Sequence, residues 1–259
     1  MSPAVIAMPG VLSPAAIRFA PVQAALAGIR TIHLKDLELY AADSISPTYS
    51  IDDEIKGLAR FADSVGARQF HLLAYSGGGF ISLAFAGTQP ERLLSLTLFE
   101  PARIPGPLTP EEVAFDARLQ SAMAGLEGPQ MIEAFIRMQV RPGVQVPPPS
   151  GPPQPWMRNR PAGIMALTRA FAAYRFDREQ LRRAAFPVLL SYGDQTAEIE
   201  EVKAAILARL FPRITIRRWP GIHHFLPPEQ IYSGEHIAAI QRGWALAEGR
   251  LAVAAGTSP

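Results

Sequence analysis

The sequence contains no cysteine among its 259 residues. This absence excludes disulfide bonds, thiolate metal ligands and a cysteine nucleophile, and it fits a reducing compartment. The chain also lacks an apolar run near the roughly 18–20 residues that a membrane-spanning helix needs. Its N-terminal stretch has no basic residue ahead of the apolar part and is interrupted by Pro9-Gly10, which makes it a poor signal peptide. We therefore expect a cytoplasmic protein with no membrane partner.

The sequence has little net charge and few lysines. Twenty-five basic residues face 23 acidic ones, for a net charge of +2, and only Lys35, Lys56 and Lys203 are lysines. Because the arginines are scattered and form no stripe, this balance argues against a nucleic-acid partner and favours a small-molecule substrate. Hydrophobic residues make up 48% of the chain, the share of ordinary globular proteins, which excludes disorder of the chain as a whole.

Short apolar runs alternate with helical patterns along most of the chain. This alternation is typical of an α/β fold, with a mostly parallel, doubly wound sheet and helices on its faces. The expected strands are Ala4–Met8, Thr31–Leu34, Phe70–Tyr75, Leu94–Phe99, Pro187–Tyr192 and Ile214–Arg217. The expected helices of this part are Ile51–Val65, Gly77–Gly87, Glu200–Leu210 and one within Ser233–Leu251.

Residues 104–184 interrupt this alternation, because they hold several helical stretches and no convincing strand. One stretch begins at Thr109-Pro110 with a capping box, and others cover Gln130–Val140 and Ala162–Tyr174. The intervening Pro142–Pro161 segment holds 8 of the 25 prolines and is expected to be an extended loop. We therefore expect a core of residues 1–103 and 185–259 with residues 104–184 inserted as a helical lid. The alternative is a surface excursion with no role.

A buried apolar run ends abruptly at Ser76, and three glycines follow before a helix begins. A sharp strand-to-helix turn strains its central residue and requires small residues two positions away, where the chain has Ala74 and Gly78. The serine would then project from the carboxyl edge of the sheet, and the N–H of Gly77 would point at a developing oxyanion. This pattern matches the nucleophile elbow G-x-S-x-G, with alanine in the first glycine position. The alternative is a glycine-rich turn that only allows close helix–strand contact.

A second stretch follows the last expected strand and carries His223 and His224. With serine and histidine in this order, the chain resembles the α/β-hydrolase superfamily, and in particular its lidded members with a serine nucleophile. The catalytic histidine of that family commonly lies in a G-x-G-H-F-x-P-x-E context. The segment from His224 through Glu229 matches this context, and His223 takes the place of the second glycine. The resemblance therefore implies that His224 is the catalytic histidine.

The family resemblance also implies an oxyanion loop after the first strand. There the family usually has His-Gly, and the residue after the glycine donates the second oxyanion N–H. This chain has Pro9-Gly10-Val11, so Gly10 and Val11 fit while a proline replaces the histidine. The donor belongs to the backbone of Val11 and is compatible with this change. The expected oxyanion hole is formed by Gly77 and Val11.

The acid of the triad has several candidates. The family most often places an aspartate three residues after a glycine, following the fifth strand, but here Thr196 stands at that position. Asp194 is close to it, although its direction is wrong in the usual geometry. A minority of such enzymes carry the acid at the end of the preceding core strand, where this chain has Glu100. We favour Glu100, with Asp194 as the alternative acid and Glu198, or no acid, behind it.

The remaining histidines predict no metal centre. His33, His71 and His236 lie in or beside expected strands or on a helix, and none forms a pair at metal-ligand spacing. A dinucleotide-binding module, built on Gly77, Gly79 and Glu100, is a competing hypothesis from another class. Against it, the third glycine position is Ser82 and the motif falls at the third expected strand. We expect no cofactor.

The predicted function is that of a serine hydrolase acting through an acyl-enzyme intermediate. A serine at the elbow excludes the family chemistries that use an aspartate nucleophile, and it leaves esters, lactones and related carboxylic derivatives as substrates. Lyase or acyl-transfer chemistry, or ligand binding without turnover, are the alternatives. Large apolar residues of the insertion suggest a partly apolar substrate, and the alternative is that most of them pack the lid onto the core. They are Phe115, Met123, Met131, Phe135, Met138, Trp156, Met165 and Phe171.

Overall fold

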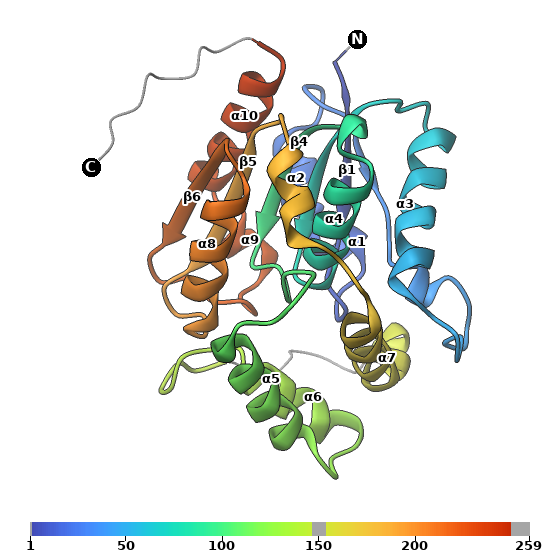
Figure 1. Cartoon of the computed structure of the whole chain (residues 1–259), viewed down its shortest axis with the longest axis vertical. Coiled ribbons are helices and arrows are strands. Elements are labelled where there is room, and N and C mark those ends of the chain that lie inside the picture. Colours follow the sequence, from blue (N-terminus) through green and yellow to red (C-terminus); the bar gives the residue numbers. More distant parts are fainter. Residues whose placement is uncertain (1, 147–153, 250–259) are drawn as a thin grey trace.

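Six parallel strands form the centre of the protein. The computed structural model describes residues 2–146 and 154–249. Its strands are β1 (Ala4–Met8), β2 (Ile32–Leu34), β3 (Phe70–Tyr75), β4 (Leu93–Phe99), β5 (Val188–Gly193) and β6 (Ile214–Trp219). They lie in the order β2-β1-β3-β4-β5-β6, and every neighbouring pair is parallel (Figure 1). The predicted strands are confirmed, with ends shifted by at most two residues.

The register of the central strands brings three segments of the sequence together. Tyr75 of β3 pairs with Phe99 of β4, and Phe99 pairs with Ser191 of β5. The residues that follow β3 and β4 therefore leave the sheet side by side at its carboxyl edge. β3 is buried at all six positions, as expected for a strand covered on both faces. A crevice at this edge is where parallel α/β sheets usually place their ligands.

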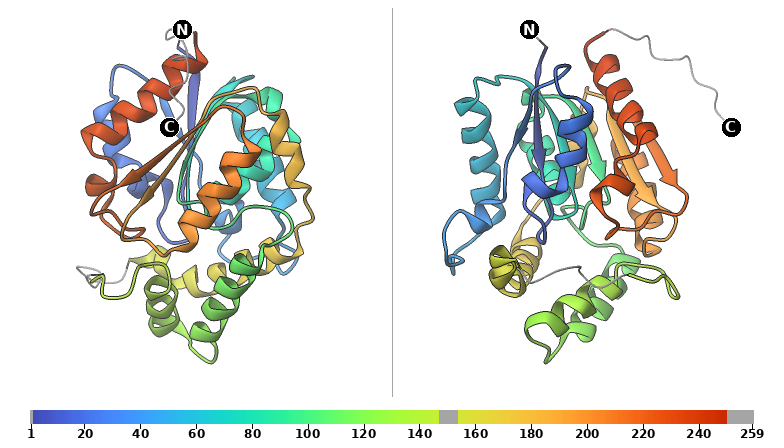
Figure 2. Two further views of the ribbon diagram at one scale, coloured as in Figure 1. Left: turned by 60° about the vertical axis from the view of Figure 1, so that its left-hand side comes forward. Right: turned by 180° about the vertical axis from the view of Figure 1, so that it is seen from behind.

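Helices cover both faces of the sheet, which confirms the doubly wound α/β architecture (Figure 2). One face carries α3 (Ile51–Ser64), α4 (Gly77–Thr88) and α8 (Ile199–Leu210). The other face carries α1 (Ala15–Arg18), α2 (Ala20–Ala25), α9 (Pro228–Ile231) and α10 (Gly234–Ala247). The longer helices confirm the predicted ones, although α10 ends at Ala247, and Leu251 lies outside the described residues. The four- and six-residue helices α1, α2 and α9 were not predicted, because they are too short for periodicity to reveal.

Helices of the insertion lie at the carboxyl end of the sheet, below the strands in Figures 1 and 2. They are α5 (Pro110–Met123), α6 (Gly128–Arg137), η3 (Pro155–Asn159) and α7 (Arg160–Ala173). The chain then returns to the core with η4 (Arg178–Arg183), which packs against α4. The capping box at the start of α5 is confirmed, since Thr109 Oγ1 accepts from the N–H of Glu112 while the Glu112 carboxylate accepts from the N–H of Thr109. No strand of the described part of the insertion joins the sheet.

The expected extended loop from Pro142 to Pro161 is wrong at its C-terminal end. Residues 155–159 form η3, and α7 already begins at Arg160. Proline supports this because it occupies the first position of η3 and the second of α7, where its missing N–H would have no intrahelical partner. Residues 147–153 of the predicted loop lie outside the described residues.

One further observation concerns membranes. Among the residues that the structure describes, no helix combines the length and the apolar character required to cross a bilayer.

Candidate active site

Ser76 occupies a strained turn between β3 and α4. Its φ of 54° and ψ of −118° lie in a region that non-glycine residues rarely adopt. Such a conformation costs on the order of 1–3 kcal/mol and persists only where the surroundings hold it. Here the Ser76 N–H donates to the Phe99 carbonyl at 3.1 Å, and the Ser76 carbonyl accepts from the N–H of Ala102 at 2.9 Å. The turn therefore projects the buried serine side chain from the carboxyl edge of the sheet.

Close backbone contacts explain the glycines around this serine. A Cβ on Gly78 would lie 2.5 Å from the Pro9 carbonyl oxygen, which accepts a 3.0 Å hydrogen bond from the Gly78 N–H. A Cβ on Gly10 would lie 2.8 Å from the Cβ of Ser76. Since these separations are too short for any side chain, only glycine allows the loop after β1 to approach Ser76.

His224 lies in the loop after β6 and faces Ser76. Its Nε2 is 3.0 Å from Ser76 Oγ, and its Nδ1 is 2.6 Å from Oε2 of Glu100. The Tyr75 ring stacks on the imidazole with ring centroids 4.7 Å apart, and the Tyr75 hydroxyl donates to the His224 carbonyl. These contacts hold the buried imidazole between the serine and the carboxylate.

Glu100 follows β4 directly and is fully buried. Its φ of 45° is the other positive value among the described non-glycine residues, so the chain turns sharply at this point as well. Its Oε1 accepts hydrogen bonds from the Gly193 N–H at 2.7 Å and from the Thr196 hydroxyl at 2.6 Å. These two donors occupy Oε1, and the other carboxylate oxygen, Oε2, contacts His224 Nδ1.

The structure brings together Ser76, His224 and Glu100, the three residues favoured from sequence, and it places their alternatives elsewhere. Oδ1 of Asp194 accepts from the Gly221 N–H at 2.8 Å, whereas the carboxylate that contacts the imidazole belongs to Glu100. Glu198 is largely exposed and pairs with Arg141. His223 is buried, but its Nδ1 accepts from the Phe225 N–H.

The expected oxyanion donors lie beside each other. The position that a Cβ on Gly77 would take is 3.6 Å from the Val11 nitrogen. Gly77 opens α4, so its N–H has no intrahelical partner. Within the described part of the chain, neither this N–H nor that of Val11 donates to a backbone carbonyl outside the regular elements. Two backbone donors next to a serine can stabilise an oxyanion at that serine.

Burial shifts the pKa values of His224 and Glu100 in opposite directions. Removal from water lowers the pKa of His224 to about 3 and raises the pKa of Glu100 to about 7. The hydrogen bonds from Thr196 and Gly193, and the positive charge of Lys203, oppose the rise at Glu100. The imidazole is consequently neutral at pH 7, which is the form that can accept the proton of a serine hydroxyl.

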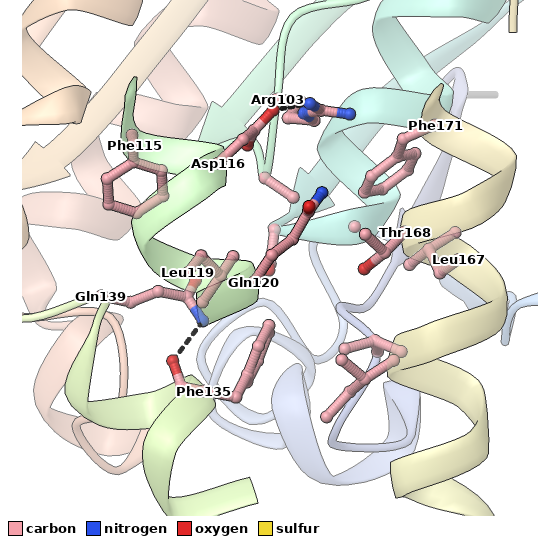
Figure 3. Close-up of a pocket in the computed structure, with 15 residues that line it drawn as sticks. Arg103, Phe115, Asp116, Leu119, Gln120, Phe135, Gln139, Leu167, Thr168 and Phe171 are labelled. Atoms are coloured by element: carbon pink, nitrogen blue, oxygen red, sulfur yellow. Dashed lines mark hydrogen bonds and ion pairs between the residues drawn. The ribbon is translucent and has the colours of Figure 1, made fainter. Parts of the chain in front are cut away.

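A cavity of about 50 Å³ lies over Ser76, between the core and the insertion (Figure 3). Its walls are mostly apolar, and polar groups from Gln120, Thr168 and the ion pair of Arg103 with Asp116 interrupt them. Three of the apolar insertion residues singled out from sequence line it, namely Phe115, Phe135 and Phe171. The other lining residues could not be predicted from the sequence, because a helical pattern does not show which side of a helix lies next to Ser76. They are Ala102, Leu119, Gln139, Ile164 and Leu167, with the four polar residues named above.

The other apolar residues of that prediction do not line the cavity. Met123 and Met131 are buried in the core between helices. Met165 is 44% exposed on the surface of α7. The Trp156 ring lies 5.2 Å from the guanidinium of Arg160. Phe115, Phe135 and Phe171 are therefore the members of this set that line the cavity, while Met123 and Met131 pack within the protein.

The structure contradicts the dinucleotide hypothesis. That hypothesis needs Glu100 free to bind a ribose, whereas its carboxylate is buried and bonded to His224, Gly193 and Thr196. A Cβ on Gly79 would lie 2.8 Å from Cα of Pro101, so this glycine allows α4 to pack closely against the turn after β4.

Within residues 2–146 and 154–249, no group of three or more acidic or histidine side chains could hold a metal ion.

Comparisons with known proteins agree with this architecture. The sequence model of the alpha/beta hydrolase fold matches residues 31–226. A thermophilic esterase from Thermogutta terrifontis is 20% identical with a TM-score of 0.71, over 95% of this chain and 91% of that one. Naproxen esterase from Bacillus subtilis is 19% identical, with a TM-score of 0.64, over 93% and 83%. NosK from Streptomyces actuosus is 17% identical, with a TM-score of 0.66, over 96% and 100%.

These structural neighbours share the fold, and none of the curated proteins matches the sequence. The family match covers 196 of the 259 residues, from the second strand through the histidine loop. It includes both the serine turn after β3 and the histidine loop after β6. The chain belongs to the α/β hydrolase fold family.

Proposed function

We propose that this protein is a serine hydrolase that cleaves a small to medium, partly apolar ester or a related carboxylic derivative such as a lactone. One observation carries the proposal. An unbroken hydrogen-bonded chain runs from Ser76 Oγ through the His224 ring to the Glu100 carboxylate, with contacts of 3.0 and 2.6 Å. This is the arrangement that activates a serine for acyl transfer.

The proposed reaction has two stages. Ser76 Oγ attacks the substrate carbonyl carbon while His224 Nε2 takes its proton, and the N–H groups of Gly77 and Val11 stabilise the oxyanion. His224 then returns the proton to the leaving alcohol, which produces the acyl-enzyme. In the second stage the same imidazole deprotonates a water molecule, which attacks the acyl carbon. The bond from this carbon to Ser76 Oγ then breaks, the imidazole returns its proton to Oγ, and the acid leaves. Glu100 holds the imidazole in the productive tautomer and stabilises its protonated form.

Residues 104–184 act in this proposal as a lid that forms the substrate cavity. Leu167 and Phe171 of α7 and Phe115 of α5 supply walls over Ser76. A cavity of about 50 Å³ holds only a small group in this conformation, so a larger acyl chain or alcohol requires the insertion to shift. Its apolar walls favour a hydrocarbon or aromatic portion next to the reacting carbonyl.

The proposal is tested with 4-nitrophenyl acetate and butyrate and with a fluorophosphonate probe. We expect release of nitrophenol, one probe molecule bound per chain, and loss of both in Ser76→Ala. Ser82→Ala is the matched control, since Ser82 is also buried in α4 and its hydroxyl has no partner among the described residues. This control should label and turn over like the wild type.

Two results would contradict the proposal. Labelling that persists in Ser76→Ala would remove the serine from the mechanism. Labelling of Ser76 without turnover of any ester or lactone in a panel of different sizes would favour acyl transfer, lyase chemistry or ligand binding instead.

A further inference from the structure

The turn after β4 connects the acid and the nucleophile to a third element. Glu100 begins this turn, and the N–H of Ala102 ends it with a 2.9 Å hydrogen bond to the Ser76 carbonyl. Between them, the Pro101 carbonyl accepts a 2.5 Å hydrogen bond from Nζ of Lys203 in α8. Because both Glu100 and Ser76 have positive φ, this short segment joins two strained residues of the proposed machinery.

Lys203 is a buried ammonium group with a specific counter-ion. Its side chain is 4% exposed, and it forms an ion pair with Glu200, one turn earlier in α8, whose side chain is 7% exposed. Moving two charged groups out of water costs more free energy than an ion pair at the protein surface contributes. A buried pair of this kind is weak evidence for stability, and its position directly beneath the Glu100 turn suggests another role.

The charged and titratable groups around Glu100 come from every neighbouring element. His224 faces it from the loop after β6, Lys203 and Glu200 from α8, and Arg18 from α1. The hydroxyls of Tyr75 and Tyr232 also interact electrostatically with Glu100, and burial keeps the pKa of each well above its usual value. Lys203 and Arg18 favour the ionised form of Glu100, while the negative charge of Glu200 opposes it.

We propose that Lys203 and Glu200 are positioning residues of the active site: Lys203 braces the Glu100–Ala102 turn and keeps the Glu100 carboxylate ionised and directed at His224, and Glu200 orients Lys203. Lys203 acts through the Pro101 carbonyl and through its charge, and Glu200 holds the ammonium in place. Neither side chain lines the cavity over Ser76, so neither contacts substrate. The inference rests on the proposed hydrolase function.

Three variants separate this role from a merely structural one. Lys203→Met removes the charge and the bond to Pro101, Lys203→Arg restores a cation, and Glu200→Gln removes the negative charge but keeps an acceptor for Nζ. The matched control is Lys35→Met. Lys35 is also buried, bonds a backbone carbonyl, that of Asp36, and forms an (i, i+3) pair with Glu38, but it lies after β2 outside the site.

The primary measurement is the pH dependence of the rate of Ser76 labelling by the fluorophosphonate probe, together with kcat and KM for 4-nitrophenyl acetate. For Lys203→Met we expect the acid limb to move up by about one pH unit. The kcat plateau should fall about tenfold, with little change in KM. For Glu200→Gln the acid limb should move down. Lys203→Arg should recover most of the plateau, and Lys35→Met should leave the profile unchanged.

Acid limbs that stay in place in both Lys203→Met and Glu200→Gln would overturn the proposal. If Lys203→Met does not fold, the opposite pH shift of Glu200→Gln and the recovery in Lys203→Arg decide it. A wild type that neither labels nor turns over esters would refute the hydrolase function instead. The titration of the His224 Nδ1–H proton by NMR in the same variants then tests the positioning role without any substrate, and identical titrations would refute it.

Discussion

The hydroxyl group of Thr196 donates a 2.6 Å hydrogen bond to Oε1 of Glu100, across the gap between the loop after β5 and the end of β4. Threonine thus stands where the family most often has its acid, and it contacts the carboxylate of Glu100 at the end of the neighbouring strand. The Val140–Thr196 bridge extends this connection to the insertion. The segment after α6 therefore meets the loop that orients Glu100.

Glu100→Gln is expected to reduce kcat by up to about 10⁴-fold with little loss of stability. The amide can still accept from Gly193 and Thr196, but its NH₂ group then faces His224 Nδ1 and favours the wrong imidazole tautomer. Asp194→Asn is the control. Among the described residues the Asp194 carboxylate accepts a hydrogen bond from the Gly221 N–H alone, so this change should have a mild effect. Steady-state kinetics with 4-nitrophenyl acetate and thermal melts compare the two. If Glu100→Gln kept the wild-type kcat while Asp194→Asn lost activity, Asp194 would be the carboxylate that orients His224.

His224→Ala should lower kcat by several orders of magnitude, since proton transfer and nucleophile activation act as a unit. His223→Ala should keep most of the probe labelling. Burial lowers the pKa of His223 too, and its loss removes a partner of the Phe225 N–H, so this variant should be less stable while it remains active. Probe labelling and kcat of both variants test the assignment, which an inactive His223→Ala beside an active His224→Ala would reverse.

Leu167→Ala should shift substrate preference toward larger acyl groups. Leu167 lines the cavity, and its Cδ2 lies 2.9 Å from where a Cβ on Gly77 would be, so its removal opens space directly beside the proposed oxyanion hole. We expect the ratio of kcat/KM for butyrate over acetate esters to rise several-fold, with a loss of about 2–5 kcal/mol in stability. Leu181→Ala, buried but away from the cavity, should lose comparable stability without this shift. An unchanged ratio in Leu167→Ala would mean that the acyl group lies elsewhere.

Glu200→Gln should gain stability relative to the wild type as the pH rises. Burial raises the pKa of Glu200 to about 7, so the folded protein holds this proton more tightly than the unfolded chain does. The resulting stabilisation is complete below about pH 4.5, the usual value, and is lost as the pH rises through about 7. Glu200→Gln has no ionisable group at this position, so it does not lose stability in this way. The difference in melting temperature between variant and wild type should therefore grow from pH 5 to pH 8.

The control for this comparison is Glu201→Gln, whose carboxylate is half exposed on the same helix. Its melting temperature should differ from that of the wild type by the same amount at both pH values. The lowered pKa of His224 contributes an opposite trend to each of these proteins and is largely removed by the comparison. A pH-independent difference for Glu200→Gln would contradict the assignment of a buried, proton-retaining carboxyl at this position.

Local pattern alone determined the sheet, the serine turn and the choice of histidine. A strand buried on both faces must be a short apolar run, and a sharp turn leaves room only for small residues such as Ala74 and Gly78 around Ser76. These constraints act over a few neighbouring residues, so they are visible in the order of amino acids. His224 was chosen over His223 from a motif of similarly short range.

Only the tertiary structure decided which of Glu100, Asp194 and Thr196 contacts the His224 imidazole, because the answer depends on the register of β4 against β5 and on a positive φ at Glu100. The tertiary structure also decided the surroundings of Lys203 and Glu200. In the sequence they are an ordinary (i, i+3) helix pair, and in the fold they are buried next to the turn of Pro101, 102 residues before Lys203. Long-range neighbours determine which carboxylates lose water, and the loss of water determines which of them hold a proton.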